Sequence, residues 1–461
     1  MTAARSVSLL GALLVMMVLT RILDEAEYGQ YQKLWLLFTV LSPGIINTAV
    51  QTLYYRGGSE SDGNPFWVTT LFVCISGFVI SVFTYFASAE IAQVLNAPDL
   101  ALAFQHFAVY MFFATIAGIG EPIFILIERK KWLLGYNIIY NLIDASLVII
   151  PFLMGYPLEQ VILFMIAGPA LRSAFLLTIT YFHAPEISRN RFSEEISASW
   201  SYAQGIIVLS VIALLIFEAD KIIVGIFMDS DADFATYVVG AKKIPFLTAL
   251  IASVSSAFIV QYAKTLSSET RAEAIPAIRH TANRLFILIL PATLFGLLYS
   301  EEILVLLFEK YAHSAPIFRI YILAMITNIF ISDTVILGAG HSHITARISF
   351  AELLLNIVFS IILIIPLGLI GPAIATVISR VINVLLCNWY CSYKYGFSTS
   401  IFFPVDGAKR IILALIVILT VYGAAILLTG NNWVGFGLTG ATTLGITIWQ
   451  NKNIGRTQQN A

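Results

Sequence analysis

Long apolar stretches alternate with short polar turns along the whole chain. Each stretch runs for about 20 residues, the length that an α-helix needs to cross the hydrocarbon core of a bilayer. The pattern predicts an all-α integral membrane protein with about 14 transmembrane helices. These cover residues 6–20, 34–55, 67–88, 103–127, 132–154, 159–181, 201–228, 235–263, 285–307, 316–338, 347–365, 370–391, 410–428 and 433–449.

Basic residues between the apolar stretches give the orientation. Most of the 26 Lys and Arg residues fall in the segments that lie on one side if both termini are on that side, for example Arg129, Lys130 and Lys131. Lys and Arg accumulate on the cytoplasmic side of membrane proteins. We therefore expect a multi-pass protein with both termini in the cytoplasm.

Composition agrees with this class and excludes several others. The 461 residues are 59% hydrophobic and only 11% charged, against about 25% charged in an average soluble domain. A net charge of -1 gives no reason to expect nucleic acid binding. The three cysteines form no CxxC pair, and no nucleotide-binding or hydrolase motif is present. We expect no metal site, no cofactor and no enzymatic activity.

A short motif occurs twice, as AEYGQY at 26–31 and as ADFATY at 232–237. Both copies fall in outer turns, six predicted helices apart. A shift by an even number of helices keeps the orientation, so the pattern predicts a parallel repeat about an axis normal to the membrane. The triplet GPA at 168–170 and 371–373 is a second, weaker repeat.

The repeat predicts the domain organisation. It consists of an N-terminal six-helix bundle, a polar cytoplasmic linker, a C-terminal six-helix bundle related to the first by a pseudo-two-fold, and two extra helices with a short cytoplasmic tail. The boundaries are 1–182, 183–200, 201–395 and 396–461.

Two stretches resemble a known family. TRILDEAEYGQY combines a helix end with an acidic turn and YGxY, and EADKIIVGIFMDSDADFATYVVGAKK repeats the acidic turn before an aromatic residue and lysines. Both are similar to the polysaccharide-type flippases of the multidrug/oligosaccharidyl-lipid/polysaccharide (MOP) superfamily. The similarity extends over most of the chain, including the repeat and the two trailing helices.

The resemblance implies a function. Flippases of this type translocate a prenyl-pyrophosphate-linked oligosaccharide, such as an O-antigen, capsule or exopolysaccharide repeat unit, across the bacterial cytoplasmic (inner) membrane. It implies contacts with membrane lipids and with polysaccharide polymerase and ligase proteins. Separately, carboxylates inside the predicted helices are what a transporter coupled to H⁺ or Na⁺ could use. The alternatives are a cation-coupled multidrug exporter of the same superfamily and a non-transporting membrane scaffold.

Cations inside predicted helices are candidates for binding the pyrophosphate. An ionisable group in a membrane helix costs free energy unless it is paired or hydrated, so it indicates function. Arginine stays charged and offers two parallel donors to phosphate oxygens. The candidates for a cationic substrate-binding cavity are Arg172, Arg380, Lys221, Lys242 and Lys243. For each arginine, the competing interpretation is that it pairs with a carboxylate or snorkels towards the inner surface.

Carboxylates inside the helices are candidates for ion coupling or for pairing between helices. Glu218 and Lys221 are three residues apart and can pair on one helix face. Asp220 then faces elsewhere, and a salt bridge with Lys242 or Lys243 is our preferred interpretation of it. The remaining candidates are Glu121, Asp144, Asp333 and Glu352.

Overall fold

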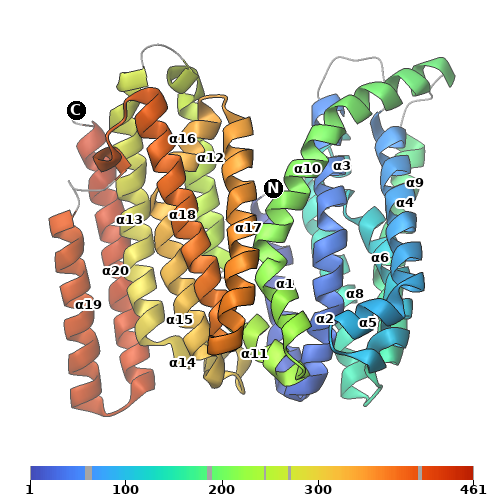
Figure 1. Ribbon diagram of the computed structural model, residues 1–461, viewed down its shortest axis with the longest axis horizontal. Coiled ribbons are helices and arrows are strands. Elements are labelled where there is room, and N and C mark those ends of the chain that lie inside the picture. The colour runs from blue at the N-terminus through green and yellow to red at the C-terminus, as the bar shows by residue number, and fades with distance from the viewer. Residues whose placement is uncertain are drawn as a thin grey trace. The chain divides into compact units, whose positions relative to one another are not determined.

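A computed structural model describes residues 2–57, 65–183, 189–242, 245–267, 271–402 and 408–459. In these ranges every regular element is a helix (Figure 1). Nine of the described helical stretches are long and apolar enough to cross a membrane, or ten if a pair bent by 44° counts as one span. The predicted all-α membrane fold is confirmed, and the count of 14 helices stays a prediction.

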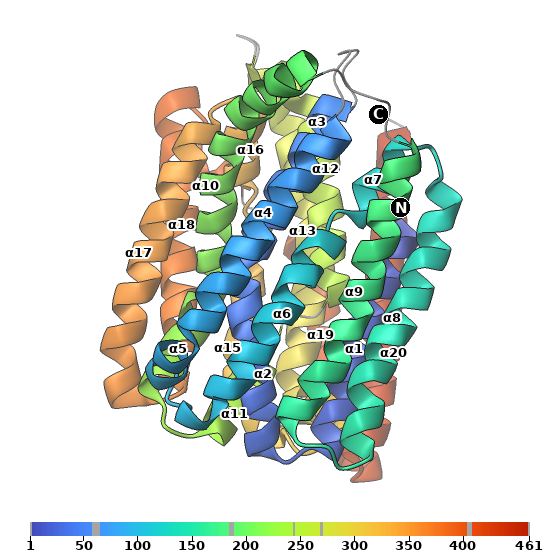
Figure 2. The same cartoon turned by 90° about the vertical axis from the view of Figure 1, so that its right-hand side faces the viewer.

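The chain divides into two compact units, Met1–Thr236 and Tyr237–Ala461. In the first unit α6 packs against α4 and α9, α1 packs against α8, and α10 runs along α3 (Figure 2). The helices of the first unit are α1 (Thr2–Ile22), α2 (Glu25–Leu41), α3 (Pro43–Gly57), α4 (Pro65–Phe86), α5 (Ser88–Val94), η1 (Pro98–Leu100), α6 (Ala101–Ala117), α7 (Gly120–Leu126), α8 (Lys130–Leu153), α9 (Leu158–His183), α10 (Arg189–Phe227) and the first part of α11 (Asp231–Gly240).

In the second unit α17 and α18 form a closely packed hairpin, and α19 and α20 form another, at the edge of the unit in Figure 1. Its remaining helices are α12 (Pro245–Ser267), η2 (Arg271–Ala274), α13 (Ile275–Leu298), α14 (Ser300–Phe308), η3 (Ala312–Ser314), α15 (Ala315–Ala324), η4 (Met325–Ile329), α16 (Ser332–Gly338), α17 (Ser342–Leu367), α18 (Ile370–Tyr395), η5 (Thr399–Phe402), α19 (Ala408–Thr429) and α20 (Asn432–Gln459).

Four of the predicted spans are each built from two helices. The span 34–55 consists of α2 and α3 and breaks at Pro43, which cannot donate the hydrogen bond that would continue α2. Three further predicted spans also consist of two helices each. The span 103–127 corresponds to α6 and α7, 235–263 to α11 and α12, and 316–338 to α15 and α16. Backbone breaks at membrane depth are tolerated where they are buried in protein or border a polar space.

One predicted span is wrong at both ends. We expected a helix over 285–307, and α13 instead begins at Ile275 and ends at Leu298, followed by the separate helix α14. The earlier start places Ile278 and Ala282 in the core of the second unit. At the other end Tyr299 leaves helical geometry, with φ -117° and ψ 32°.

The start of α2 is fixed by the sequence around the first copy of the repeated motif. The Asp24 carboxylate accepts a hydrogen bond from the Glu27 amide at 2.8 Å, and the Glu27 side chain accepts one from the Asp24 amide at 3.2 Å. This reciprocal capping box satisfies amides that the first helical turn leaves without partners. The acidic turn before YGxY therefore has a structural role.

Helix α10 extends beyond the span that we predicted over 201–228. It contains 39 residues, which is about 58 Å at 1.5 Å per residue, whereas the hydrocarbon core is about 30 Å thick. Residues 189–200, which we assigned to a polar linker, form its first turns. Residues 184–188 of that linker lie outside the described part of the chain. The predicted division into two six-helix bundles stays a prediction.

A glycine allows the backbones of α17 and α18 to lie close together near the turn that joins them. A Cβ atom added to Gly371 would overlap the backbone of Leu363 on the opposite helix, whereas one added to Gly135 in α8 would meet no atom within 4 Å. We expect Gly371→Ala to force the hairpin apart and to lower the apparent Tm of the detergent-solubilised protein by several degrees, because a 1 kcal/mol loss shifts the Tm of a large domain by about 2–4 °C. Gly135→Ala is the matched control and should leave the Tm unchanged or raise it. Equal Tm values for the two variants would contradict this account of the hairpin.

Candidate functional site

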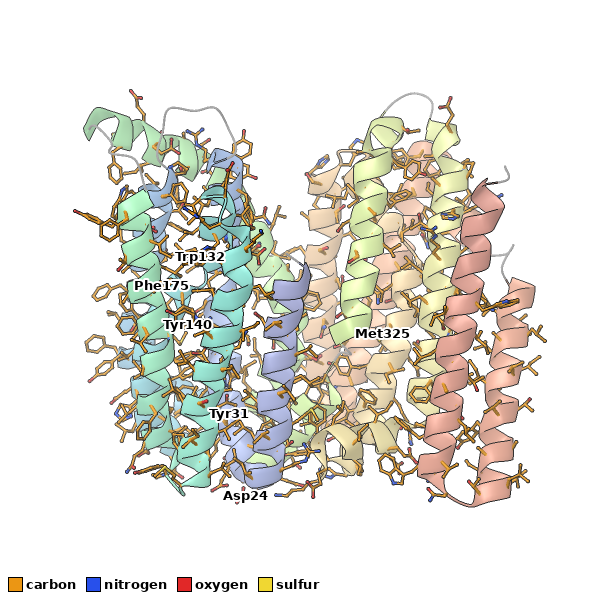
Figure 3. All side chains as sticks on the ribbon, turned by 180° about the vertical axis from the view of Figure 1, so that it is seen from behind. Asp24, Tyr31, Trp132, Tyr140, Phe175 and Met325 are labelled. Atoms are coloured by element: carbon orange, nitrogen blue, oxygen red, sulfur yellow. The ribbon has the colours of Figure 1, made fainter. Side chains whose placement is uncertain are left out.

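An ion pair lies near the middle of the hairpin formed by α8 and α9. Arg172 Nη2 on α9 is 2.6 Å from Asp144 Oδ2 on α8. The guanidinium also lies over two tyrosine rings of α8, 5.2 Å from the ring centre of Tyr140 and 5.8 Å from that of Tyr136. Contacts of this kind between a cation and an aromatic face are favourable, and more so where water is scarce. Figure 3 shows Tyr140 about half-way along its helix.

The surroundings of this pair are unusually polar for a membrane helix. Among the described residues, Asp144 Oδ1, Arg172 Nε and the Tyr136 hydroxyl are buried and make no hydrogen bond. A Cβ atom on Gly168 would overlap the Asp144 carboxylate, so the glycine of the first GPA triplet provides the space for it. The cluster therefore has hydrogen-bonding capacity that its own side chains do not use.

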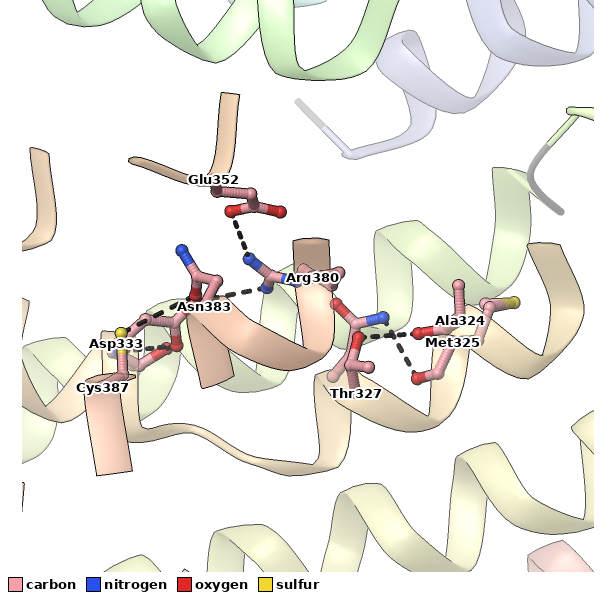
Figure 4. Close-up of polar contacts among 10 residues, drawn as sticks. Ala324, Met325, Thr327, Asp333, Glu352, Arg380, Asn383 and Cys387 are labelled. Atoms are coloured by element: carbon pink, nitrogen blue, oxygen red, sulfur yellow. Dashed lines mark hydrogen bonds and ion pairs between the residues drawn. The ribbon is translucent and has the colours of Figure 1, made fainter. Parts of the chain in front are cut away.

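The second unit contains a related cluster, in which Arg380 lies between two carboxylates (Figure 4). Arg380 on α18 contacts Asp333 on α16 and Glu352 on α17, both at 3.5 Å. Glu352 is almost completely buried, whereas about a third of the Asp333 side chain is exposed. On the next turns of α18, the Cys387 thiol donates to the Asn383 amide oxygen at 3.7 Å. At usual ionisation states these charged groups sum to -1.

The two clusters share one sequence separation. Asp144 and Arg172 are 28 residues apart, and so are Glu352 and Arg380. In both hairpins the carboxylate is on the first helix and the arginine on the second. The sequence prediction named all four residues, but it did not pair them. The GPA triplets occupy different places, in the middle of α9 and in the first turn of α18.

The other predicted site residues lie at several separate positions. Lys221 binds Glu218 at 2.9 Å on α10, so the predicted pairing on one helix face is confirmed. Asp220 is 2% exposed on the same helix. Glu121 at the start of α7 accepts a hydrogen bond from the Tyr54 hydroxyl at 3.4 Å.

Lys242 does not lie where we expected it. We placed Lys242 and Lys243 inside a continuous helix, but α11 ends at Gly240 and α12 begins at Pro245. Lys242 lies in the break between them, and Lys243 lies outside the described residues. The missing amide hydrogen of Pro245 and its restriction on the preceding residue favour this break. The salt bridge of Asp220 with one of these lysines stays a prediction.

Sequence reasoning missed a buried cation. The second predicted span begins at residue 34 and leaves Lys33 outside it, but Lys33 lies within α2, is completely buried and binds Asp231 at 2.6 Å. A second missed pair joins Arg56 on α3 to Glu195 on α10 by two hydrogen bonds of 2.8 and 2.7 Å. The position of Lys33 four residues after Gly29 of the first motif copy was the available signal for the first pair.

The family described as "Polysaccharide biosynthesis protein" matches residues 1–262, which is more than half of the chain. The chain belongs to this family. No curated protein matches its sequence.

Solved structures show the fold of this family member. It is similar to "Lipid II flippase MurJ, inward closed conformation", with a TM-score of 0.67, 14% identity, and coverage of 99% of this chain and 98% of the other. A multidrug resistance MATE family transporter of the MOP superfamily gives a TM-score of 0.61 at 14% identity, with 85% and 96% covered. A MOP superfamily transporter from Pyrococcus furiosus gives 0.55 at 14% identity, with 85% and 93% covered. The chain therefore has the fold of these transporters.

The two arginine clusters of this polysaccharide biosynthesis family member differ in burial, and this difference gives a prediction. Removing the guanidinium of Arg380 leaves Glu352, which is 5% exposed, and Asp333 without it, whereas Arg172 faces the 38% exposed Asp144. Loss of one partner from a buried pair costs about 3–5 kcal/mol, and loss from an exposed pair about 1 kcal/mol or less. We expect Arg380→Met to lower the apparent Tm more than Arg172→Met does.

The control for this comparison adds Asp333→Asn and Glu352→Gln to Arg380→Met. Neutral amides remove the charges that the guanidinium compensated, so the triple variant should recover most of the lost Tm. A larger loss in Arg172→Met, or no recovery in the triple variant, would show that burial does not determine the contribution of these pairs.

Proposed function

We propose that this family member is a flippase that moves a prenyl-pyrophosphate-linked oligosaccharide from the inner to the outer leaflet of the bacterial cytoplasmic membrane by alternating access. In this proposal both termini are cytoplasmic and the protein has no catalytic activity. The observation that carries it is the partly exposed ion pair of Arg172 and Asp144 in the middle of a hairpin of membrane helices.

The depth and exposure of this pair support a polar pathway. The Arg172 and Asp144 side chains are 23% and 38% exposed, although both α8 and α9 qualify as membrane spans. Charged side chains at this depth face the interior of a bundle or a water-filled space, because lipid tails cannot solvate them. A flippase for a polar head group needs such a surface, whereas a membrane scaffold does not.

The paired state of each arginine suggests how the substrate would bind. The guanidiniums of Arg172 and Arg380 contact carboxylates, so in our proposal a pyrophosphate would compete with these carboxylates for the same donors. Arginine suits this exchange of a carboxylate for a phosphate because its guanidinium offers two parallel N–H donors to either group. Lysine lacks this paired geometry and suits the exchange less well. The tyrosine rings beside Arg172 offer apolar faces against which a sugar ring could pack.

The cation-coupled multidrug exporter is the second candidate, and one observation favours it. The cluster of Arg380, Asp333 and Glu352 contains one more carboxylate than cations, which suits a site for a proton or Na⁺. An ion-coupled flippase would use the same excess of negative charge. The identity of the substrate therefore distinguishes the two candidates better than this cluster does.

The first experiment identifies the substrate. Lipids extracted from cells that lack the protein should contain an accumulated prenyl-pyrophosphate oligosaccharide, detected and identified by mass spectrometry. Re-expression of the native chain should remove it. Unchanged lipids together with increased sensitivity to cationic drugs would exclude the flippase and support the multidrug exporter.

The arginine clusters give a prediction for the same assay. We expect Arg172→Ala and Arg380→Ala to reduce complementation by at least about tenfold, the effect of losing about 1.4 kcal/mol of binding, with normal levels of protein in the membrane. Arg172→Lys should restore less than half of the activity, because lysine lacks the two-pronged geometry. Normal complementation by both alanine variants would contradict a role for these side chains in substrate binding.

The buried carboxylate Asp220 tests coupling separately. Asp220→Asn keeps the shape of the side chain, but it removes the charge and replaces one acceptor oxygen by an NH2 donor. Normal complementation is expected if Asp220 is only a partner between helices, as in the salt bridge that we prefer, and its place tolerates the amide. Loss of complementation at normal protein levels would instead support a role in H⁺ or Na⁺ coupling.

A further inference from the structure

The Arg172 guanidinium of the first unit lies against a group of packed aromatic rings. Phe175 on α9 joins Tyr136 and Tyr140 on α8, and its ring centre is 6.1 Å from that of each tyrosine (Figure 3). The two tyrosine ring centres are 4.8 Å apart, and Phe124 on α7 lies 4.9 Å from Tyr136. Tyr136 is 8% exposed. These rings come from three helices and limit the movement of the guanidinium.

Asp144 is the more accessible partner of the ion pair. Its side chain is 38% exposed, against 23% for Arg172. Pairing with an arginine does not require this exposure, since Glu352, at the same sequence separation from Arg380, is 5% exposed. Asp144 Oδ2 binds the guanidinium, whereas Oδ1 lies against Gly168 and has no hydrogen-bond partner in the described part of the chain. The carboxylate therefore uses only one of its two oxygens.

Binding of a pyrophosphate to Arg172 would change what Asp144 needs. In the proposed function the phosphate oxygens take the guanidinium donors that Asp144 Oδ2 now holds. A carboxylate that loses its cation inside a membrane span is unstable unless other donors replace it. An ionised carboxylate accepts hydrogen bonds and donates none. The group that lies beside the pyrophosphate must therefore bring O–H or N–H donors to Asp144.

An uncharged sugar linked to the pyrophosphate brings such donors. Neighbouring hydroxyl groups on a sugar ring can donate to the two oxygens of one carboxylate. The C–H groups of the same ring can pack against the negative face of an aromatic ring such as Tyr140. An acidic sugar would instead place a second carboxylate beside Asp144, and two like charges at close range repel each other. The site therefore distinguishes sugars by charge.

We propose that Asp144 is a specificity residue, which selects an uncharged, hydroxyl-bearing sugar next to the pyrophosphate and rejects a uronic acid there. This inference rests on the proposed function and narrows its substrate class. Arg172 binds the phosphate, and the carboxylate that it releases binds the first sugar. The pair exchanges one charge-assisted contact for two, so both parts of the substrate are recognised in a single event.

The experiment measures the binding of three synthetic lipids to the detergent-solubilised full chain. They are geranylgeranyl pyrophosphate and the same lipid linked to glucose or to glucuronic acid, two sugars that differ only in a hydroxymethyl or carboxylate group. Radiolabelled lipid gives each Kd by equilibrium binding. We expect the glucose lipid to bind at least about tenfold more tightly than the glucuronic acid lipid. Asp144→Asn should reduce this ratio to about threefold or less, and the charge-conserving Asp144→Glu should keep the preference for glucose.

The three lipids separate this inference from the proposed function. Equal affinity of the native chain for the two sugar lipids, or an unchanged ratio in Asp144→Asn, would overturn the role of Asp144. Binding of the lipid without a sugar would in that case still support recognition of the pyrophosphate. No binding of any of the three lipids would overturn the proposed function and this inference with it. The comparison of the two sugars in the native chain needs no variant, so it decides the question even if Asp144→Asn fails to fold.

Discussion

A charge placed among lipid tails must be paired or hydrated, and the polar interior of this protein is organised by that requirement. Arg172, Arg380, Lys221 and Lys33 each contact a carboxylate, on a neighbouring helix in every case except Lys221. Each such pair costs desolvation, and its mutual attraction repays this cost only in good geometry. The pairs are therefore better explained as functional or positional elements than as a source of stability, which the packing of apolar side chains provides.

The hairpins α8–α9 and α17–α18 use the same arrangement, but with different charge balance. In the first unit Arg172 contacts one carboxylate. In the second unit Arg380 contacts two. A duplicated chain can keep the position of a charge in both copies while the two copies acquire separate tasks. In our proposal one cluster contacts the substrate and the other combines this with ion coupling.

The apolar windows predicted the helices because the length of a membrane helix is set by the bilayer. The sequence was less informative where two helices share a span, since a break such as that before Pro245 changes few residues in a hydropathy window. Arg172 and Asp144 could be selected as charges inside predicted membrane helices, but their pairing depends on the register of α8 against α9, which no local pattern encodes. Lys33 was misplaced because the capping box begins α2 at Glu25, so that a lysine assigned to a turn lies well inside a helix.

The length of α10 has a mechanical consequence. Arg56 and Glu195 connect its first turns to α3 through two short hydrogen bonds, and Asn47 and Ser210 connect the same two helices again at 2.8 Å. A rod about 58 Å long that is clamped to its neighbour in two places resists bending. A tilt of about 5° would displace its far end by roughly 5 Å. A small rotation near Glu195 would therefore produce a much larger displacement at the opposite end of the helix, as in a lever.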